Sequence, residues 1–174
     1  MMVTTLRFPH LAMCVHIGMH IDAPSHFLSG GASISDLELV RFVGEAQVVD
    51  LSRAHEIGAE ELDSIEVKSG TKRLLLKTSN SRLYKRNVFD KDCVALMPDG
   101  TEWVRAKDIS VVGSDYASID TFGERENETH KIFLNAGIAI VEGLDFSKIS
   151  PGIYAFICLP LKLTGVEVHR QEQY

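Results

Sequence analysis

The chain has 174 residues, of which 45% are apolar and 24% are charged, and its formal net charge is −6. This length and composition predict one globular domain over residues 1–174, large enough to bury an apolar core. The acidic balance argues against nucleic acid and anionic membranes as partners, and no apolar run is long enough to cross a bilayer.

The first half of the chain predicts helices and strands in alternation. Residues 35–42 form a predicted helix, because Ser35 and the glutamate three positions later make a capping box. A largely apolar strand is predicted over 46–52, and a second one over 73–79. The polar stretch 58–66 between them predicts another helix.

The second half continues this alternation. Helices are predicted over 101–108 and 129–137, the second with Thr129 as its N-cap residue and Gly137 as its C-terminal stop. Strands are predicted over 109–115, 137–144 and 152–163. Together these segments predict a single mixed α/β domain, and they leave the order of the strands in the sheet open.

The cysteines suggest a cellular compartment rather than a function. Cys14, Cys93 and Cys158 are odd in number and widely scattered, so they form no disulfide framework. None has a second cysteine at metal-ligand spacing, so we expect all three cysteines to be buried and to pack as small apolar side chains. This usage is typical of the reducing cytoplasm.

The stretch "HIGMHIDAPSH" (16–26) contains the candidate functional residues. It places His16, His20, Asp22 and His26 within eleven residues of a chain that has seven histidines in all. Imidazole and carboxylate are the ligands that zinc and manganese accept, whereas calcium or magnesium would require more oxygen atoms. A single histidine of this kind is usually a solvated loop residue, but the four together favour a metal site.

The local backbone of this stretch must be folded for its side chains to converge. A helix is disfavoured because Gly18 weakens it and Pro24 breaks it. A straight strand would place His16 and His26 about 33 Å apart, whereas zinc ligands lie ~2.0–2.2 Å from the ion. We therefore predict a folded loop that bends at Gly18 and whose last part is made rigid by Pro24.

The motif extends to "HIGMHIDAPSHF" (16–27) and resembles the signature H-x-G-T-H-x-D-x-P-x-H-F of the cyclase family of metal-dependent hydrolases. That family includes bacterial kynurenine formamidase (arylformamidase) and isatin hydrolase. Every fixed position agrees except Met19, which stands in place of the threonine. The similarity continues through most of the chain, in the segments 46–52, 73–79, 109–120, 129–144 and 158–165.

The resemblance implies a swivelling β/β/α fold and a role for each polar residue of the motif. His16, His20 and Asp22 would bind a first metal ion, and His26 would be the general acid/base. Two residues outside the motif, His130 and Glu142, would complete a second metal site, with Asp22 and Glu142 able to bridge the ions. A short helix followed by a returning strand would allow His130 and Glu142 to meet at one end of that unit.

The resemblance also implies an activity. The enzyme would cleave a small amide, such as the N-formyl arylamine N-formylkynurenine or a lactam, with a metal-activated water and His26 as proton shuttle. One or two divalent ions are expected, zinc first and manganese second. The family further implies a homodimer or homotetramer and, here, a shortened N-terminal segment.

Two alternatives stay open at this point. In the first, the same fold serves another small cyclic amide or ester, and the sequence does not separate these substrates. A non-catalytic protein could instead keep the ligands as a structural metal site. The presence of His26 argues against that second alternative, because a structural site does not need a proton shuttle.

Overall fold

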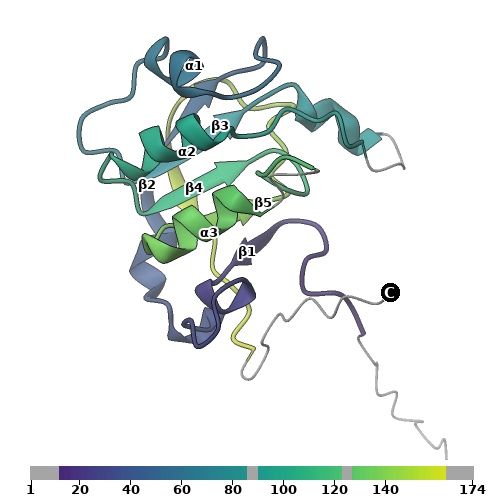
Figure 1. The fold of residues 1–174 in the computed structure, drawn as a ribbon, viewed down its shortest axis with the longest axis vertical. Helices are drawn as coiled ribbons and strands as arrows, with labels where there is room; N and C mark the ends of the chain where they lie inside the picture. The colour runs from purple at the N-terminus through teal and green to yellow at the C-terminus, as the bar shows by residue number, and fades with distance from the viewer. Residues whose placement is uncertain (1–11, 86–89, 123–126, 164–174) are drawn as a thin grey trace, which may run out of the picture.

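The computed structural model describes residues 12–85, 90–122 and 127–163. Within these ranges six strands form one sheet in the order β1-β5-β4-β3-β2-β6 (Figure 1). The strands are β1 (His20–Asp22), β2 (Val43–Asp50), β3 (Arg73–Lys77), β4 (Val111–Ser114), β5 (Ala139–Glu142) and β6 (Gly152–Ile157). The central strands β2 to β5 run parallel, and the edge strands β1 and β6 run antiparallel to their neighbours. This confirms the predicted mixed α/β class.

Three α-helices lie within the described ranges: α1 (Ala59–Asp63), α2 (Pro98–Arg105) and α3 (Glu128–Asn135). Figure 1 shows α2 and α3 in front of the sheet, and the three pack in sequence, α1 on α2 and α2 on α3. None of the helices in the described part of the chain is long and apolar enough to cross a membrane.

The sheet is apolar on both faces. Leu74 and Leu76 of β3 belong to the cluster that also contains Phe133 of α3. Leu75 belongs to a second cluster, with Val141 of β5 among its members. Because successive side chains of a strand point to opposite faces, the continuous apolar run of β3 serves both clusters, as expected for a buried parallel strand.

The predicted helix over 35–42 is wrong. The chain instead forms two short 3-10 helices, Ile34–Asp36 and Leu39–Phe42, and the capping box joins Ser33 and Asp36. The backbone is extended at Leu37 and Glu38, which separates the two turns. The Arg73 guanidinium then donates hydrogen bonds to the carbonyls of residues 40, 41, 43 and 45, and so holds the chain where it enters β2.

The predicted boundaries of other elements also shift. Asn127, not Thr129, is the N-cap residue of α3. Thr129 is buried and its hydroxyl lies 3.0 Å from that of Thr101 in α2, so it joins two helices instead of capping one. The α2 helix starts at Pro98, where the missing proline N–H costs nothing. Strand β6 ends at Ile157, short of the predicted residue 163.

One expectation about the cysteines is also wrong. Cys158 is buried, but Cys93 is only partly buried and Cys14 is exposed. All three are free thiols, as the odd and scattered count predicts.

Candidate metal centre

The histidine-rich stretch sits at the edge of the sheet because β1 pairs with β5. The register places His20 opposite Glu142 and Asp22 opposite Ile140. Gly18 has a φ of +66°, which confirms the predicted bend before the strand. The stretch is therefore folded, as predicted, but it also contains the three-residue strand β1, which the sequence did not predict.

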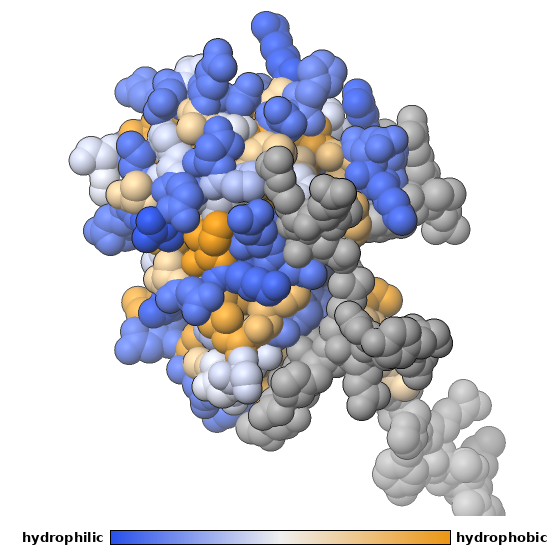
Figure 2. Space-filling view, in the orientation of Figure 1, coloured by the Kyte–Doolittle hydropathy of each residue, from blue (hydrophilic) through white to orange (hydrophobic). Residues whose placement is uncertain are grey.

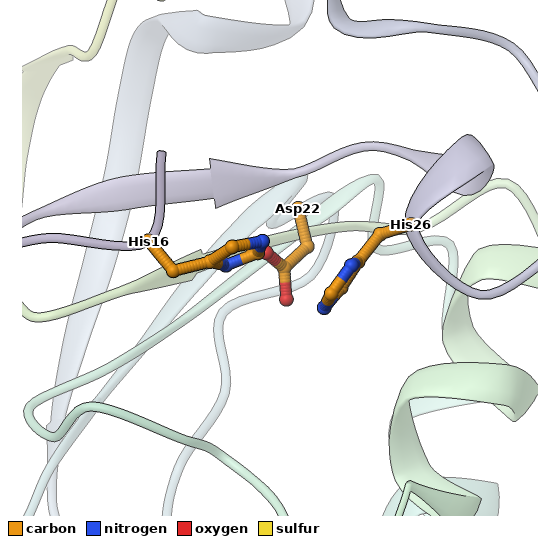
Figure 3. Close-up of side chains that lie close together, drawn as sticks. All are labelled: His16, Asp22 and His26. Carbon is orange, nitrogen blue, oxygen red and sulfur yellow. The ribbon is translucent and has the colours of Figure 1, made fainter. Parts of the chain in front are cut away.

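Pro24 stands at the exit from the strand, where the loop was predicted to end. Pro24 opens a 3-10 helix, Pro24–His26, which turns His26 back towards Asp22. In Figure 3 the side chains of His16 and His26 approach Asp22 from either side, one from the loop before β1 and the other from the turn after it.

Asp22 is the centre of the cluster and is almost fully buried. Its Oδ1 lies 3.1 Å from Nδ1 of His16 and 3.7 Å from Nε2 of His20. Its Oδ2 lies 3.3 Å from Nε2 of His130, at the start of α3. A single carboxylate thus contacts histidines from two distant parts of the sequence.

Glu142, the last residue of β5, is the second buried carboxylate. Its Oε1 lies 3.1 Å from Nε2 of His130 and accepts a hydrogen bond from the backbone N–H of Ile119. Its Oε2 lies 3.4 Å from Nε2 of His20. The predicted meeting of His130 and Glu142 across the helix–strand unit is confirmed.

Two groups of side chains have ligand atoms close enough to hold one ion each, within 4.8 Å of one another. They are His16, Asp22 and His26, and His20, Asp22 and Glu142. Asp22 belongs to both, in agreement with its predicted bridging place. The predicted first site joined His16 with His20 and kept His26 outside, so the division of roles among these histidines stays a prediction.

The hydrogen bonding of the cluster fits a divalent cation. Both carboxylate oxygens of Asp22, and Nε2 of His16 and of His20, are buried and make no well-aligned hydrogen bond to a described residue, although imidazole nitrogens lie 3.1–3.7 Å from the Asp22 oxygens. A buried polar atom without a partner is costly, and most such atoms are paired in folded proteins. Ions held by the two ligand groups would give partners to His16, His20 and Asp22, which together carry all of these atoms.

The charges of the cluster shift the pKa values of its members. Burial alone would raise the pKa of Asp22, but the imidazoles of His130 and His16 hold it well below its usual range. Burial alone would lower the pKa of His130, but its contacts with Asp120, Asp22 and Glu142 raise it to about 11. Without a cation the site therefore holds a proton on His130, and metal binding must displace that proton.

Asp120 is the residue of the site that sequence reasoning missed. It is buried, and its Oδ2 lies 3.1 Å from Nδ1 of His130. This contact fixes the orientation of the ring and keeps Nε2 between Asp22 and Glu142. Once a metal ion displaces the Nε2 proton, the Nε2 lone pair would be available in that fixed direction. The available signal was its place in the loop after β4, since ligands gather beyond the carboxyl ends of parallel strands.

Removal of the Asp120 carboxylate is expected to weaken metal binding without unfolding the chain. In Asp120→Ala, His130 loses the partner that orients it, and zinc affinity should fall about 10- to 100-fold. Competition with a coloured chelator measures this. Asp50→Ala, which removes an exposed carboxylate at the end of β2, is the matched control and should leave the affinity unchanged. Equal affinities of the two variants would remove Asp120 from the site.

Comparison with known proteins places this geometry in a family. A family model described as "Putative cyclase" matches residues 2–121. Kynurenine formamidase of Bacillus cereus is 35% identical over 157 residues, which cover 90% of this chain and 74% of that protein. Cyclase-like protein 3 of Oryza sativa subsp. japonica is 36% identical over 159 residues, covering 87% of this chain and 59% of that protein. The chain spans about three fifths of the length of the plant cyclase-like proteins that it matches.

Comparison of the fold with solved structures supports the same family assignment. A solved structure described as a potential metal-dependent hydrolase with cyclase activity superposes with a TM-score of 0.81 at 32% identity, covering 90% of this chain and 76% of that one. The histidine-rich motif, the family match and the superposed sheet agree. The chain belongs to the cyclase family.

Proposed function

We propose that the chain is a metal-dependent hydrolase that cleaves the C–N bond of a small amide, with N-formyl arylamines as the first substrates to test. The observation that carries the proposal is the buried cluster around Asp22, whose carboxylate oxygens lie 3.1–3.7 Å from nitrogens of His16, His20 and His130 but make no well-aligned hydrogen bond to a described residue. The similarity to kynurenine formamidase of Bacillus cereus supports the choice of substrate.

A divalent ion at this cluster would make a bound water acidic enough to react near neutral pH and would polarise the carbonyl of the substrate. His16, His20, Asp22, His130 and Glu142 would hold it, and zinc or manganese suits this mixture of imidazole and carboxylate.

His26 is proposed to move the proton. Its ring centroid lies 4.2 Å from that of His16 and 4.1 Å from that of Phe27, so the ring is held beside the metal ligands. A histidine titrates close to neutral pH and can serve in both directions. It would accept a proton from the attacking water and donate it to the departing nitrogen, so that the products are a free amine and a carboxylic acid.

The proposal is tested first by metal content. Protein freed of metal with a chelator is incubated with zinc or manganese, and bound metal is measured per chain. Two ions per chain support the full ligand set, and one ion restricts it to one of the two groups. No bound ion after incubation would contradict the proposal.

His26→Ala separates catalysis from metal binding. Metal content should be unchanged, while kcat for a formyl arylamine should fall about 10²- to 10⁴-fold, the usual contribution of a general acid/base. His55→Ala, at an exposed position outside the cluster, is the matched control and should retain full activity. Loss of metal in His26→Ala would instead make His26 a ligand, as its grouping with His16 and Asp22 allows. Unchanged activity would remove it from the mechanism.

A further inference from the structure

An apolar cleft opens beside the metal cluster. Its cavity volume is about 230 Å³, and the residues that line one part of it include His16, Asp22 and His26. A cavity of about 150 Å³ is sufficient to hold benzene. The cleft therefore has room for an aromatic ring together with the amide group that would be attacked.

The two walls of the cleft are aliphatic. Met13, Val15 and Met19 come from the segment that leads into β1, and Leu159, Leu161 and Leu163 come from the segment that follows β6. All six are partly exposed, with exposed fractions from 36% to 69%. Figure 2 shows that hydrophilic side chains predominate on the upper part of the visible face. A second group of exposed apolar side chains lies away from the cleft, on β6 and the segment that leads into β2, and includes Ile157 and Val40. Exposed apolar surface that is gathered in one place marks a binding site.

Outside the metal cluster, the described residues that line the cleft offer no charged group to an ionised substituent. Among the described residues that line the cleft, Asp22 is the one carboxylate, and it belongs to the metal cluster. No lysine or arginine is among them, and Ser25 is the one hydroxyl. A carboxylate or ammonium group held between these walls would lose its water without gaining a partner, which is costly.

We propose that this cleft selects an uncharged, apolar amide, an N-acyl arylamine without an ionised substituent on the ring or side chain. The inference rests on the proposed hydrolase function for the identity of the bond that is cleaved. The aryl group would lie between the walls at Met19 and Leu161, with the amide carbonyl directed towards Asp22 and the histidines around it. The occupant is a small molecule rather than another protein, because metal-cluster residues form part of the same cavity.

A matched pair of substrates tests the proposal. Formanilide and N-formylanthranilate share the formyl arylamine group and differ by one ring carboxylate. We expect kcat/KM of the metal-loaded protein to be at least about 10-fold higher for formanilide, because the carboxylate finds no partner in the cleft. N-formylkynurenine, with its ammonium and carboxylate groups, should also be the poorer substrate. A preference for either charged compound would overturn the proposal and leave the hydrolase function intact.

A charge placed in the wall should change the preference. Leu161→Lys adds a cation inside the cleft, and we expect it to raise kcat/KM for N-formylanthranilate and lower it for formanilide. Val40→Lys is the matched control, because Val40 and Leu161 are both 69% exposed and Val40 does not line the cleft. If the two variants change selectivity equally, the aryl group does not lie beside Leu161 and the proposal fails.

Binding of unreactive analogues keeps the test independent of catalysis. Equilibrium dialysis with acetanilide and N-acetylanthranilate should show tighter binding of acetanilide to the wild type and a reversed order in Leu161→Lys. If neither formyl compound is hydrolysed but this binding order is found, the proposed function fails and the assignment of the cleft holds. If neither analogue binds, the assignment of the cleft is wrong.

Discussion

Asp22→Asn is expected to abolish zinc binding at micromolar concentrations of the metal. Asp22 belongs to both ligand groups, and its two oxygens face three histidines within 3.7 Å. Asparagine keeps the shape of the side chain, but it removes the negative charge and exchanges one acceptor oxygen for an N–H₂ donor. The fall in affinity should exceed the ~10- to 100-fold typical for loss of a group behind a ligand. Zinc titration of the chelator-treated variant measures it.

Asp115→Asn is the matched control for this prediction. Asp115 is equally buried, but its carboxylate already accepts hydrogen bonds from the backbone N–H and hydroxyl groups of Thr78 and Ser81. This variant should lower the free energy of unfolding, by roughly 1–3 kcal/mol, and leave zinc affinity unchanged. Urea unfolding and zinc titration of both variants separate the two effects. Wild-type zinc affinity in folded Asp22→Asn would show that Asp22 is not a ligand.

Gly143→Ala is expected to disrupt the metal centre from outside it. Gly143 follows Glu142 and has a φ of +78°, where a side chain costs about 1–3 kcal/mol. A Cβ atom there would also lie 2.8 Å from the carbonyl carbon of Gly18 and 3.0 Å from Cα of Met19. The turn before β1 would have to move away, and with it His20, whose position opposite Glu142 depends on that contact. We expect a lower free energy of unfolding and a loss of zinc affinity of at least about tenfold.

Gly70→Ala separates the effect of backbone strain from that of the steric contact with Gly18 and Met19. Gly70 has a similar φ of +83°, but a Cβ atom there would have no neighbour within 4 Å. This variant should carry the cost of backbone strain alone and bind zinc as the wild type does. The two variants are compared by urea unfolding and by zinc competition with a chelator. Equal zinc affinities would show that the close approach of Gly143 to Gly18 does not position His20.

The ligand set illustrates what local sequence reveals. His16, His20, Asp22 and His26 are close in the chain, and Gly18 and Pro24 disfavour a helix there. A straight strand would hold His16 and His26 about 33 Å apart, too far to bind one ion. The bend at Gly18 and the turn opened by Pro24 were therefore predictable, because steric rules act within a few residues. The resemblance to the cyclase motif led to His130 and Glu142, which lie far from the motif in the sequence.

The helix expected over 35–42 shows where local rules fail. The capping box forms at Ser33 and Asp36 instead of Ser35 and Glu38, and Arg73 of β3 binds the carbonyls of residues 40 and 41 at the end of the segment. The cap expected at Thr129 fails for a related reason, because the buried hydroxyl of Thr129 contacts Thr101 of α2. Both segments are held by contacts with residues remote in sequence.

The sequence by itself determined which residue types can bind a metal, since histidines and carboxylates at these spacings have few other uses. The tertiary structure decided how they are arranged. Pairing of β1 with β5 brings His20 to Glu142, and the loop after β4 brings Asp120 to His130. The aliphatic cleft was likewise invisible in the sequence, because its walls come from segments at opposite ends of the chain. Such contacts depend on strand order and register, which local patterns do not specify.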